Sequence, residues 1–221
     1  WLVMVVGISL LVMGVLQLFY RVFPTHISTM EVLKDTHQQL TQLASTDPLT
    51  GLSNRRTFLD ELEQLVGHPE HSGYKSAIMF LDLDGFKPIN DTEGHDVGDA
   101  VLRTVAKRIE KTIRRSDIAA RYGGDEFTVC LRGIDNREGI ERIARQLTSS
   151  ISAPIHLDNK TYCINTSIGI SIYQDHGNDH LNLLEKADSA MYEVKRVGGD
   201  GVAFHGNCEI KPRHNQSGLE V

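Results

Sequence analysis

Short apolar runs alternate with amphipathic stretches along residues 46–206, and this alternation restricts the possible folds more than any other feature. Apolar runs bounded by turn residues are typical of strands, and apolar residues recurring every three or four positions are typical of helices. The patterns predict helices over 53–66, 97–109, 140–147 and 181–197, and strands over 77–83, 118–122, 126–131, 161–173 and 202–205. This order predicts an α/β (α+β) fold with a central, mainly antiparallel sheet flanked by helices, as in ferredoxin-like domains.

Residues 1–23 have a different character. No charged residue occurs from Trp1 to Tyr20, and a helix needs about 20 apolar residues to cross a bilayer. A signal peptide would begin with basic residues and end at a cleavage site of small residues, and neither pattern occurs here. A buried helix that is apolar on every side would be unusual in so small a domain. We therefore expect a transmembrane helix over residues 1–23, which contacts the membrane through residues 1–20.

Residues 24–45 are expected to form a helical linker. Five of them recur at spacings of three and four, as in a coiled-coil seam: Met30, Leu33, His37, Leu40 and Ala44. His37 is either a switch in this seam or a tolerated polar interruption. Residues 207–221 are polar and contain Gly and Pro, so we expect a disordered tail after the domain at 46–206.

The composition argues against one class of partner. The 221 residues carry a formal net charge of -6, whereas a general nucleic-acid binder usually presents a basic face. We therefore expect no nucleic acid as a partner. The three cysteines, Cys130, Cys163 and Cys208, are far apart and show no metal-like spacing with histidines, so reduced thiols in a cytosolic domain are expected.

Two acidic residues follow a glycine pair in the segment Arg121–Phe127, RYGGDEF. Gly123 and Gly124 fit a two-residue hairpin turn between the expected strands, because glycine readily adopts positive φ. Asp125 and Glu126 are unusual in a purely structural hairpin, since acidic residues are poor strand formers and costly beside a core. Neighbouring strand residues point to opposite faces, so one of the two acids can face a cleft. A glycine pair is common in hairpins, so this motif alone does not distinguish a turn from a site.

Two further carboxylates end the strand expected at 77–83. Asp82 and Asp84 need a cation or hydrogen bonds to stay charged there, because the strand is expected to be buried. Mg²⁺ is often held by one or two carboxylates together with substrate phosphates. The alternative is that Asp82 and Asp84 are solvated residues at a strand end.

The residues after this strand have side chains suited to a nucleotide. Backbone N–H groups around Phe86 and the ammonium of Lys87 are suited to phosphates. Pro88 fits the first position of a helix. Asn90 and Asp99 have side chains that can hydrogen-bond the edge of a guanine base.

Four segments together resemble the GGDEF family of diguanylate cyclases: Asp47–Arg56 (DPLTGLSNRR), Asp82–Asp99, Arg121–Phe127 and Ser167–Lys195. They follow the family's order and spacing from Thr46 to His205. The resemblance implies a nucleotide-cyclase-like fold and the condensation of two GTP molecules into cyclic di-GMP and two pyrophosphates. It also implies Mg²⁺, or alternatively Mn²⁺, as the cofactor, and a homodimer, because one domain cannot place both nucleotides.

The resemblance also implies a role for individual positions. Asp82, Asp125 and the carbonyl of Leu83 are implied as metal ligands, and Asp125, Glu126 and Lys87 as catalytic residues. Substrate binding is implied for Phe86, Lys87, Asn90, Asp99, Gly123, Gly124 and Lys195. Family members often carry an arginine four residues after that lysine. Gly199 stands there in this chain, so one phosphate contact is expected to be missing.

A second site is implied upstream of the glycine pair. Arg114 and Asp117 form an Arg-x-x-Asp sequence at the spacing of the family's product-inhibition motif, and Arg145 matches the arginine that joins it. Arginine can stack on guanine and bind guanine or phosphate through two hydrogen bonds. From the residues alone, an ordinary charged helix end explains the same cluster.

The resemblance and the apolar segment together predict a location. A GTP-using domain must face the cytoplasm, so we expect an inner-membrane protein whose partners are GTP, cyclic di-GMP and a second copy of the chain.

Two alternatives stay open: an inactive GGDEF domain that acts as a GTP or cyclic di-GMP receptor, and a partner domain for a phosphodiesterase module. Degenerate members usually lose the signature acids, and this chain keeps Asp82, Asp125 and Glu126, which favours the enzyme.

Overall fold

The computed structural model describes residues 45–67, 75–134, 136–206 and 211–212, with a few positions between Trp1 and Gln17. The chain divides into two units, Trp1–Ala44 and Ser45–Val221. The predicted membrane helix at 1–23, linker at 24–45 and tail at 207–221 therefore lie almost wholly outside the described residues. Within the described part of the chain, no helix has the length and apolar character needed to span a membrane.

The second unit is built on a mixed sheet. Its strand order is β1 (Ser53–Asn54), β3 (Ile118–Gly123), β4 (Glu126–Ile134), β2 (Lys75–Asp84), β7 (Asn165–Ile172), β8 (Gly201–Phe204) and β9 (Lys211–Pro212). The β1–β3 and β7–β8 pairs are parallel and the other pairs are antiparallel. The predicted α/β architecture, with a mainly antiparallel central sheet, is thus confirmed.

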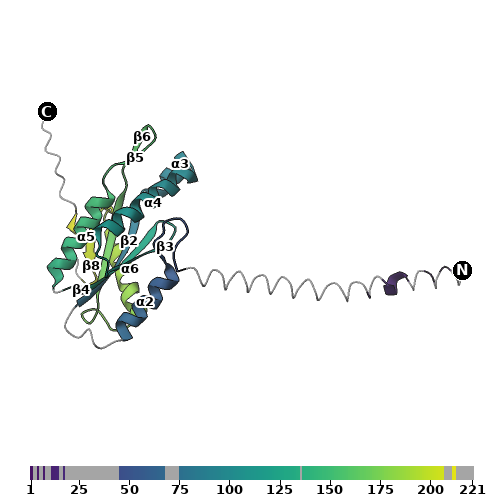
Figure 1. The fold of residues 1–221 in the computed structure, drawn as a ribbon, viewed down its shortest axis with the longest axis horizontal. Helices are drawn as coiled ribbons and strands as arrows, with labels where there is room; N and C mark the ends of the chain where they lie inside the picture. The colour runs from purple at the N-terminus through teal and green to yellow at the C-terminus, as the bar shows by residue number, and fades with distance from the viewer. Residues whose placement is uncertain are drawn as a thin grey trace. The chain divides into compact units, whose positions relative to one another are not determined.

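Helices cover both faces of this sheet (Figure 1). They are α2 (Arg55–Gly67), α3 (Phe86–Glu93), α4 (His95–Thr112), α5 (Arg137–Ile151) and α6 (His180–Arg196). Helices α3, α4 and α5 contribute to a core with one face of the sheet, and α2 and α6 contribute to a second core with the other face.

The central strand β2 is buried on both faces, because its residues alternate between the two cores. Met79, Leu81 and Leu83 pack toward α4 and α5, whereas Ile78 and Phe80 pack toward α2 and α6. Side chains along a strand alternate between its faces. Asp82 therefore points to the same face as Phe80, the face that α6 covers.

The prediction of one continuous strand over 161–173 is wrong. The chain forms a separate hairpin of β5 (Ile155–Leu157) and β6 (Lys160–Tyr162), and β7 begins only at Asn165. Alternation continues across the break because Tyr162 and Ile164 both pack against the α4–α5 core, so the pattern could not reveal it. The hairpin lies at the same end of the domain as α3 (Figure 1).

The helix predicted over 97–109 is longer and is preceded by another helix. Gly94, with φ +88° and ψ +166°, separates α3 from α4. Pro88 is the third residue of α3 rather than the first. Proline is tolerated there because the first N–H groups of a helix have no partner within the helix.

Candidate active site

Asp82 and Lys195 meet at the edge of the α6 face. Asp82 is 8% exposed, and its Oδ1 forms an ion pair with the ammonium of Lys195 near the end of α6. Burial raises the pKa of Asp82, while the hydrogen bond and charge of Lys195 oppose the rise and the charges of Asp125 and Asp84 add to it. A buried carboxylate thus has one protein cation as its direct counter-charge.

Glu126 lies directly opposite Asp82 on the neighbouring strand. Cross-strand partners point to the same face of a sheet, so both carboxylates lie on the face covered by α6. The pKa of Glu126 is raised first by burial and then by the negative charges of Asp82, Asp188 and Asp125. Burial also raises the pKa of Asp188, which lies on α6. The sheet and α6 therefore concentrate negative charge in one place.

The signature turn is shifted by one residue from the prediction. Gly123 still pairs with Glu126, so the turn residues are Gly124 and Asp125 rather than the two glycines. Only Gly124 of the glycine pair has positive φ, at +50°. The carbonyl of Asp125 accepts a hydrogen bond of 3.3 Å from the N–H of Leu83. The structure thus brings together the backbones of the three predicted metal ligands, Asp82, Leu83 and Asp125.

These residues fit a magnesium ion in donor chemistry. Carboxylate and carbonyl oxygens are hard ligands, and Mg²⁺ commonly takes one or two carboxylates and completes its shell with water and substrate phosphates. Among the described residues, no group of three His, Cys, Asp or Glu side chains is arranged to hold a metal ion. The predicted ligand set would therefore depend on the nucleotide for its remaining ligands.

Helix α3 presents the residues predicted to bind the nucleotide. Phe86 is buried in the core, Lys87 is exposed, and Asn90 is half-buried. The side chain of Asn90 lies over Gly98 on α4: a Cβ added at Gly98 would stand 1.8 Å from Asn90 Oδ1 and 3.3 Å from Phe86 Cζ. Gly98 therefore permits the contact between α3 and α4. This role of Gly98 was not predicted from the sequence, although a glycine inside a helical pattern was an available signal.

Asp99 and the glycine pair are more open. Asp99 faces Arg103 one turn further along α4, with 3.6 Å between Asp99 Oδ2 and Arg103 Nη2. Gly123 and Gly124 are exposed at the hairpin. These three predicted substrate contacts therefore lie on accessible surface.

Asp84 accepts a hydrogen bond from the segment that follows α6. Its carboxylate accepts hydrogen bonds of 2.9 Å from Ser167 Oγ and from the N–H of Asp200. Gly199 has φ +76°, and a Cβ there would stand 2.9 Å from the Asp84 carboxyl group. Gly199, at the position where the resemblance implied an arginine, thus combines a left-handed φ with a close approach to the Asp84 side chain.

The predicted inhibitory residues are only partly brought together. Asp117 is buried, and its two oxygens accept hydrogen bonds from the N–H groups of Arg114, at 2.9 Å, and Arg132, at 3.0 Å. Arg145 instead forms an ion pair of 2.8 Å with Glu141 on its own helix. A cavity of about 390 Å³ beside Arg114 is lined by Arg142, one turn before Arg145.

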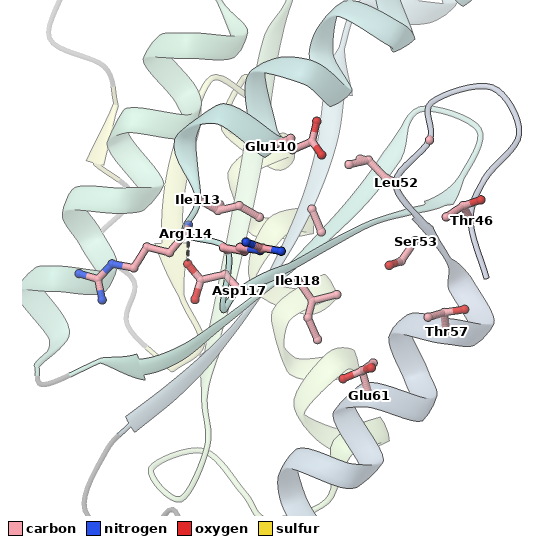
Figure 2. Close-up of a pocket in the computed structure, with 13 residues that line it drawn as sticks. Thr46, Leu52, Ser53, Thr57, Glu61, Glu110, Ile113, Arg114, Asp117 and Ile118 are labelled. Carbon is pink, nitrogen blue, oxygen red and sulfur yellow. Dashed lines mark hydrogen bonds between the residues drawn. The ribbon is translucent and has the colours of Figure 1, made fainter.

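A second cavity is also lined by Arg114. It has a volume of about 490 Å³ and is bounded by the loop after α4, the segment 51–53 and the start of α2. Figure 2 shows Arg114 and Asp117 on one side of it, with Thr57 and Glu61 of α2 on the other. Thr57 and Glu61 therefore contribute a hydroxyl and a carboxylate to the lining of this cavity.

A family model described as "Diguanylate cyclase, GGDEF domain" matches residues 44–201. The chain belongs to the GGDEF family. It is 40% identical over 165 residues to diguanylate cyclase TpbB of Pseudomonas aeruginosa, and this match covers 74% of this chain and 38% of TpbB. It is 38% identical over 172 residues to the cyclic di-GMP phosphodiesterase NbdA of that organism, and this match covers 78% of this chain and 22% of NbdA. The chain thus spans well under half the length of these relatives.

The GGDEF fold is confirmed by a solved structure. The crystal structure of the GGDEF domain of TpbB, also called YfiN, matches with a TM-score of 0.69 at 37% identity, and the match covers 72% of this chain and 99% of that domain. The predicted family and its nucleotide-cyclase-like fold are therefore correct for the unit that contains the candidate site.

Proposed function

We propose that this GGDEF domain is a diguanylate cyclase that condenses two GTP molecules into cyclic di-GMP and two pyrophosphates. The observation that carries the proposal is the placement of Asp82 and Glu126 opposite each other, beside the turn that holds Asp125 and against Lys195. The pKa values of Asp82 and Glu126 are raised by burial and by neighbouring negative charge. A divalent metal ion, which can bind carboxylates and nucleotide phosphates together, is the kind of ligand that neutralises such a site.

The residues of this chain would hold one GTP in each domain. Asn90 and Asp99 would bind the guanine edge, and Phe86, Lys87, Gly123 and Gly124 would lie along the nucleotide. Lys87 and Lys195 would supply positive charge to the phosphates. Mg²⁺, or Mn²⁺, held by Asp82, Asp125 and the Leu83 carbonyl, would stabilise the phosphate oxygens and lower the pKa of the attacking hydroxyl.

The reaction needs two domains. The 3′-hydroxyl oxygen of one GTP attacks the α-phosphorus of the other, the bond from that phosphorus to pyrophosphate breaks, and the hydroxyl proton passes to solvent. A second transfer in the opposite direction closes the ring. Two facing half-sites hold the reacting atoms in place, which removes much of the entropic cost of an encounter. A homodimer is therefore part of the proposed mechanism.

The test is the formation of cyclic di-GMP from GTP and Mg²⁺ by the wild type and by Asp125→Ala. Loss of the carboxylate should lower turnover by on the order of a hundredfold or more while the fold survives. Asp60→Asn, in an exposed ion pair on α2 with Arg56, is the matched control. Near-wild-type product formation by folded Asp125→Ala would rule out the metal assignment.

The membrane helix at 1–23 and the linker at 24–45 complete the proposal, with the catalytic domain on the cytoplasmic side of the inner membrane. Both segments would raise the effective concentration of two domains. Removing residues 1–44, at the boundary between the two units, should leave a domain whose specific activity falls on dilution. Activity per domain that stays constant on dilution would show that these residues do not promote pairing.

Product inhibition is proposed at Arg114, Asp117 and Arg145. Cyclic di-GMP bound there should inhibit in a way that excess GTP does not relieve, because the two ligands occupy different places. Arg114→Ala should weaken this inhibition without changing the uninhibited rate. Equal sensitivity of the two proteins to product would show that the arginines form only a charged surface.

A receptor for GTP or cyclic di-GMP is the second candidate. The feature that favours it is Gly199, which stands where the resemblance implies an arginine that contacts phosphate. NbdA, of which this chain matches 22%, is named as a phosphodiesterase, so similarity to this relative does not by itself favour the cyclase. Binding of GTP without formation of cyclic di-GMP by the wild-type dimer would favour the receptor.

A further inference from the structure

The β5–β6 hairpin is bonded to the end of α3. Lys160 Nζ on β6 donates a hydrogen bond of 2.7 Å to Glu93 Oε2, at the last residue of α3. Tyr162, also on β6, lies near the same carboxylate and also contributes to lowering its pKa. The hydrogen bond and charge of Lys160 lower the pKa of Glu93, so the carboxylate is ionised and paired at neutral pH.

The hairpin is itself fixed to α4. The guanidinium of Arg108 on α4 donates to the carbonyls of Ile151, Ala153 and Pro154, at 2.8, 2.6 and 2.8 Å. Ile155, the first residue of β5, is buried in the same core as α4. The hairpin therefore gives α3 a rigid support that is anchored outside α3.

Such a support matters because α3 is not continuous with α4. Gly94, in a conformation open mainly to glycine, separates the two helices. Phe86, Asn90 and Glu93 are spaced as i, i+4 and i+7, so they lie along one face of α3. Restraining Glu93 therefore restrains the rotation of α3 about its axis. The side chain of Asn90 on the same face is thereby kept over Gly98.

We propose that Glu93, Lys160 and Tyr162 form a clamp that positions α3, and with it Asn90, for binding the guanine base. The clamp rests on the GTP binding proposed above. These three are positioning residues, because they act through Asn90 rather than on the reacting atoms. The consequence should appear in nucleotide affinity and not in the chemical step.

The test measures two quantities on the full chain. The first is the dissociation constant of 3′-deoxy-GTP, which lacks the attacking hydroxyl and cannot react. The second is the separate values of KM and kcat for GTP. Lys160→Met should weaken binding of the analogue by about two- to fivefold, as expected for loss of an exposed ion pair that orders a binding element. KM should rise by the same factor, with kcat unchanged.

Matched variants separate positioning from stability. Lys160→Arg should keep wild-type affinity, and Tyr162→Phe should give a smaller loss than Lys160→Met. The charge exchange Glu93→Lys with Lys160→Glu should restore the affinity that each single change lowers. Asp60→Asn removes an exposed ion pair elsewhere and should change neither quantity. All variants should keep the wild-type thermal midpoint.

Unchanged affinity for 3′-deoxy-GTP in folded Lys160→Met and Glu93→Gln would overturn the proposed clamp. A charge exchange that does not restore this affinity would also overturn it. A lower kcat with unchanged KM would also overturn it, because the effect would then lie in the reaction. If the wild type binds 3′-deoxy-GTP but makes no cyclic di-GMP, the cyclase proposal fails and the affinities still decide the clamp. If the wild type does not bind the analogue, both proposals fail.

Discussion

Arg121 joins Asp47 to the signature turn. Its Nη1 lies 3.4 Å from Asp47 Oδ2, and its Nε donates a hydrogen bond of 3.0 Å to the carbonyl of Gly124. Burial alone would raise the pKa of Asp47, but hydrogen bonds from Thr50 and the charge and hydrogen bond of Arg121 lower it. The first turn of the domain is thereby connected to the turn that holds Asp125, 78 positions later in the chain.

Replacing Arg121 with lysine should lower cyclase activity by on the order of tenfold, with little loss of stability. A lysine keeps the charge but cannot reach the carboxylate and the carbonyl together as a planar guanidinium does, and loosened positioning of reacting groups is costly. Initial rates of cyclic di-GMP formation measure the effect. Arg56→Lys, at an exposed arginine 3.9 Å from Asp60, is the control. Equal rates in both variants would mean that Arg121 does not position the turn.

Gly98→Ala should weaken GTP binding by about three- to tenfold, the range expected when one hydrogen bond is lost. The added Cβ would overlap Asn90 Oδ1, so Asn90 must leave its place over α4. Stability should change little, because alanine is the better helix former and the Asn90 side chain can move aside. Titration with 3′-deoxy-GTP measures the loss. Adding Asn90→Ala to Gly98→Ala should cause no further loss; additive losses would contradict the argument.

Gly199→Arg should destabilise the domain rather than supply the missing phosphate contact. A side chain at φ +76° costs about 1–2 kcal/mol from backbone strain, and its Cβ also meets the Asp84 carboxyl group at 2.9 Å. Denaturant unfolding compares Gly199→Arg, and Gly199→Ala as the smaller change, with Gly206→Ala, where φ is +77° and no atom lies within 4 Å of an added Cβ. Both Gly199 variants should be less stable than Gly206→Ala. Equal stability would show that the Asp84 contact adds nothing.

The stability of the domain should fall in mild acid partly through His176. Its Nδ1 accepts a hydrogen bond of 3.0 Å from the N–H of Ile172. Burial, His205, Arg137 and Lys186 lower its pKa below 6.5, and Asp175 opposes them. Because the unfolded chain binds this proton more readily, the contribution is complete above pH 6.5 and is lost as the pH falls below that value.

Thermal unfolding at about pH 8 and about pH 5.5 tests this dependence. His176→Asn keeps an acceptor near the Nδ1 position but cannot titrate, so its midpoint should fall less between the two pH values than that of the wild type. His156→Asn, at an exposed histidine on β5, serves as the control and should behave as the wild type. The same fall in all three proteins would assign the acid sensitivity to other groups.

Local sequence patterns predicted most helices and strands. The register of the signature turn and the contacts within the site depend on packing between these elements, which local patterns do not determine. The apolar run ending in Asp82 predicted β2, because a strand buried on both faces is apolar at nearly every position. The one-residue shift of the turn at Gly124 depends on pairing between Gly123 and Glu126, which no local rule fixes. The ion pair of Asp82 with Lys195 joins residues far apart in the chain, so its formation depends on how α6 packs on the sheet.

The described sheet ends in very short strands. Its outermost members, β1 and β9, have two residues each, while the strands that carry Asp82 and Glu126 lie inside it. A short edge offers few free backbone donors and acceptors to a strand from another molecule. Along the edge at β1, two such domains therefore have little basis for joining their sheets into one continuous sheet. The same short edge lowers the risk of aggregation through an exposed β-strand.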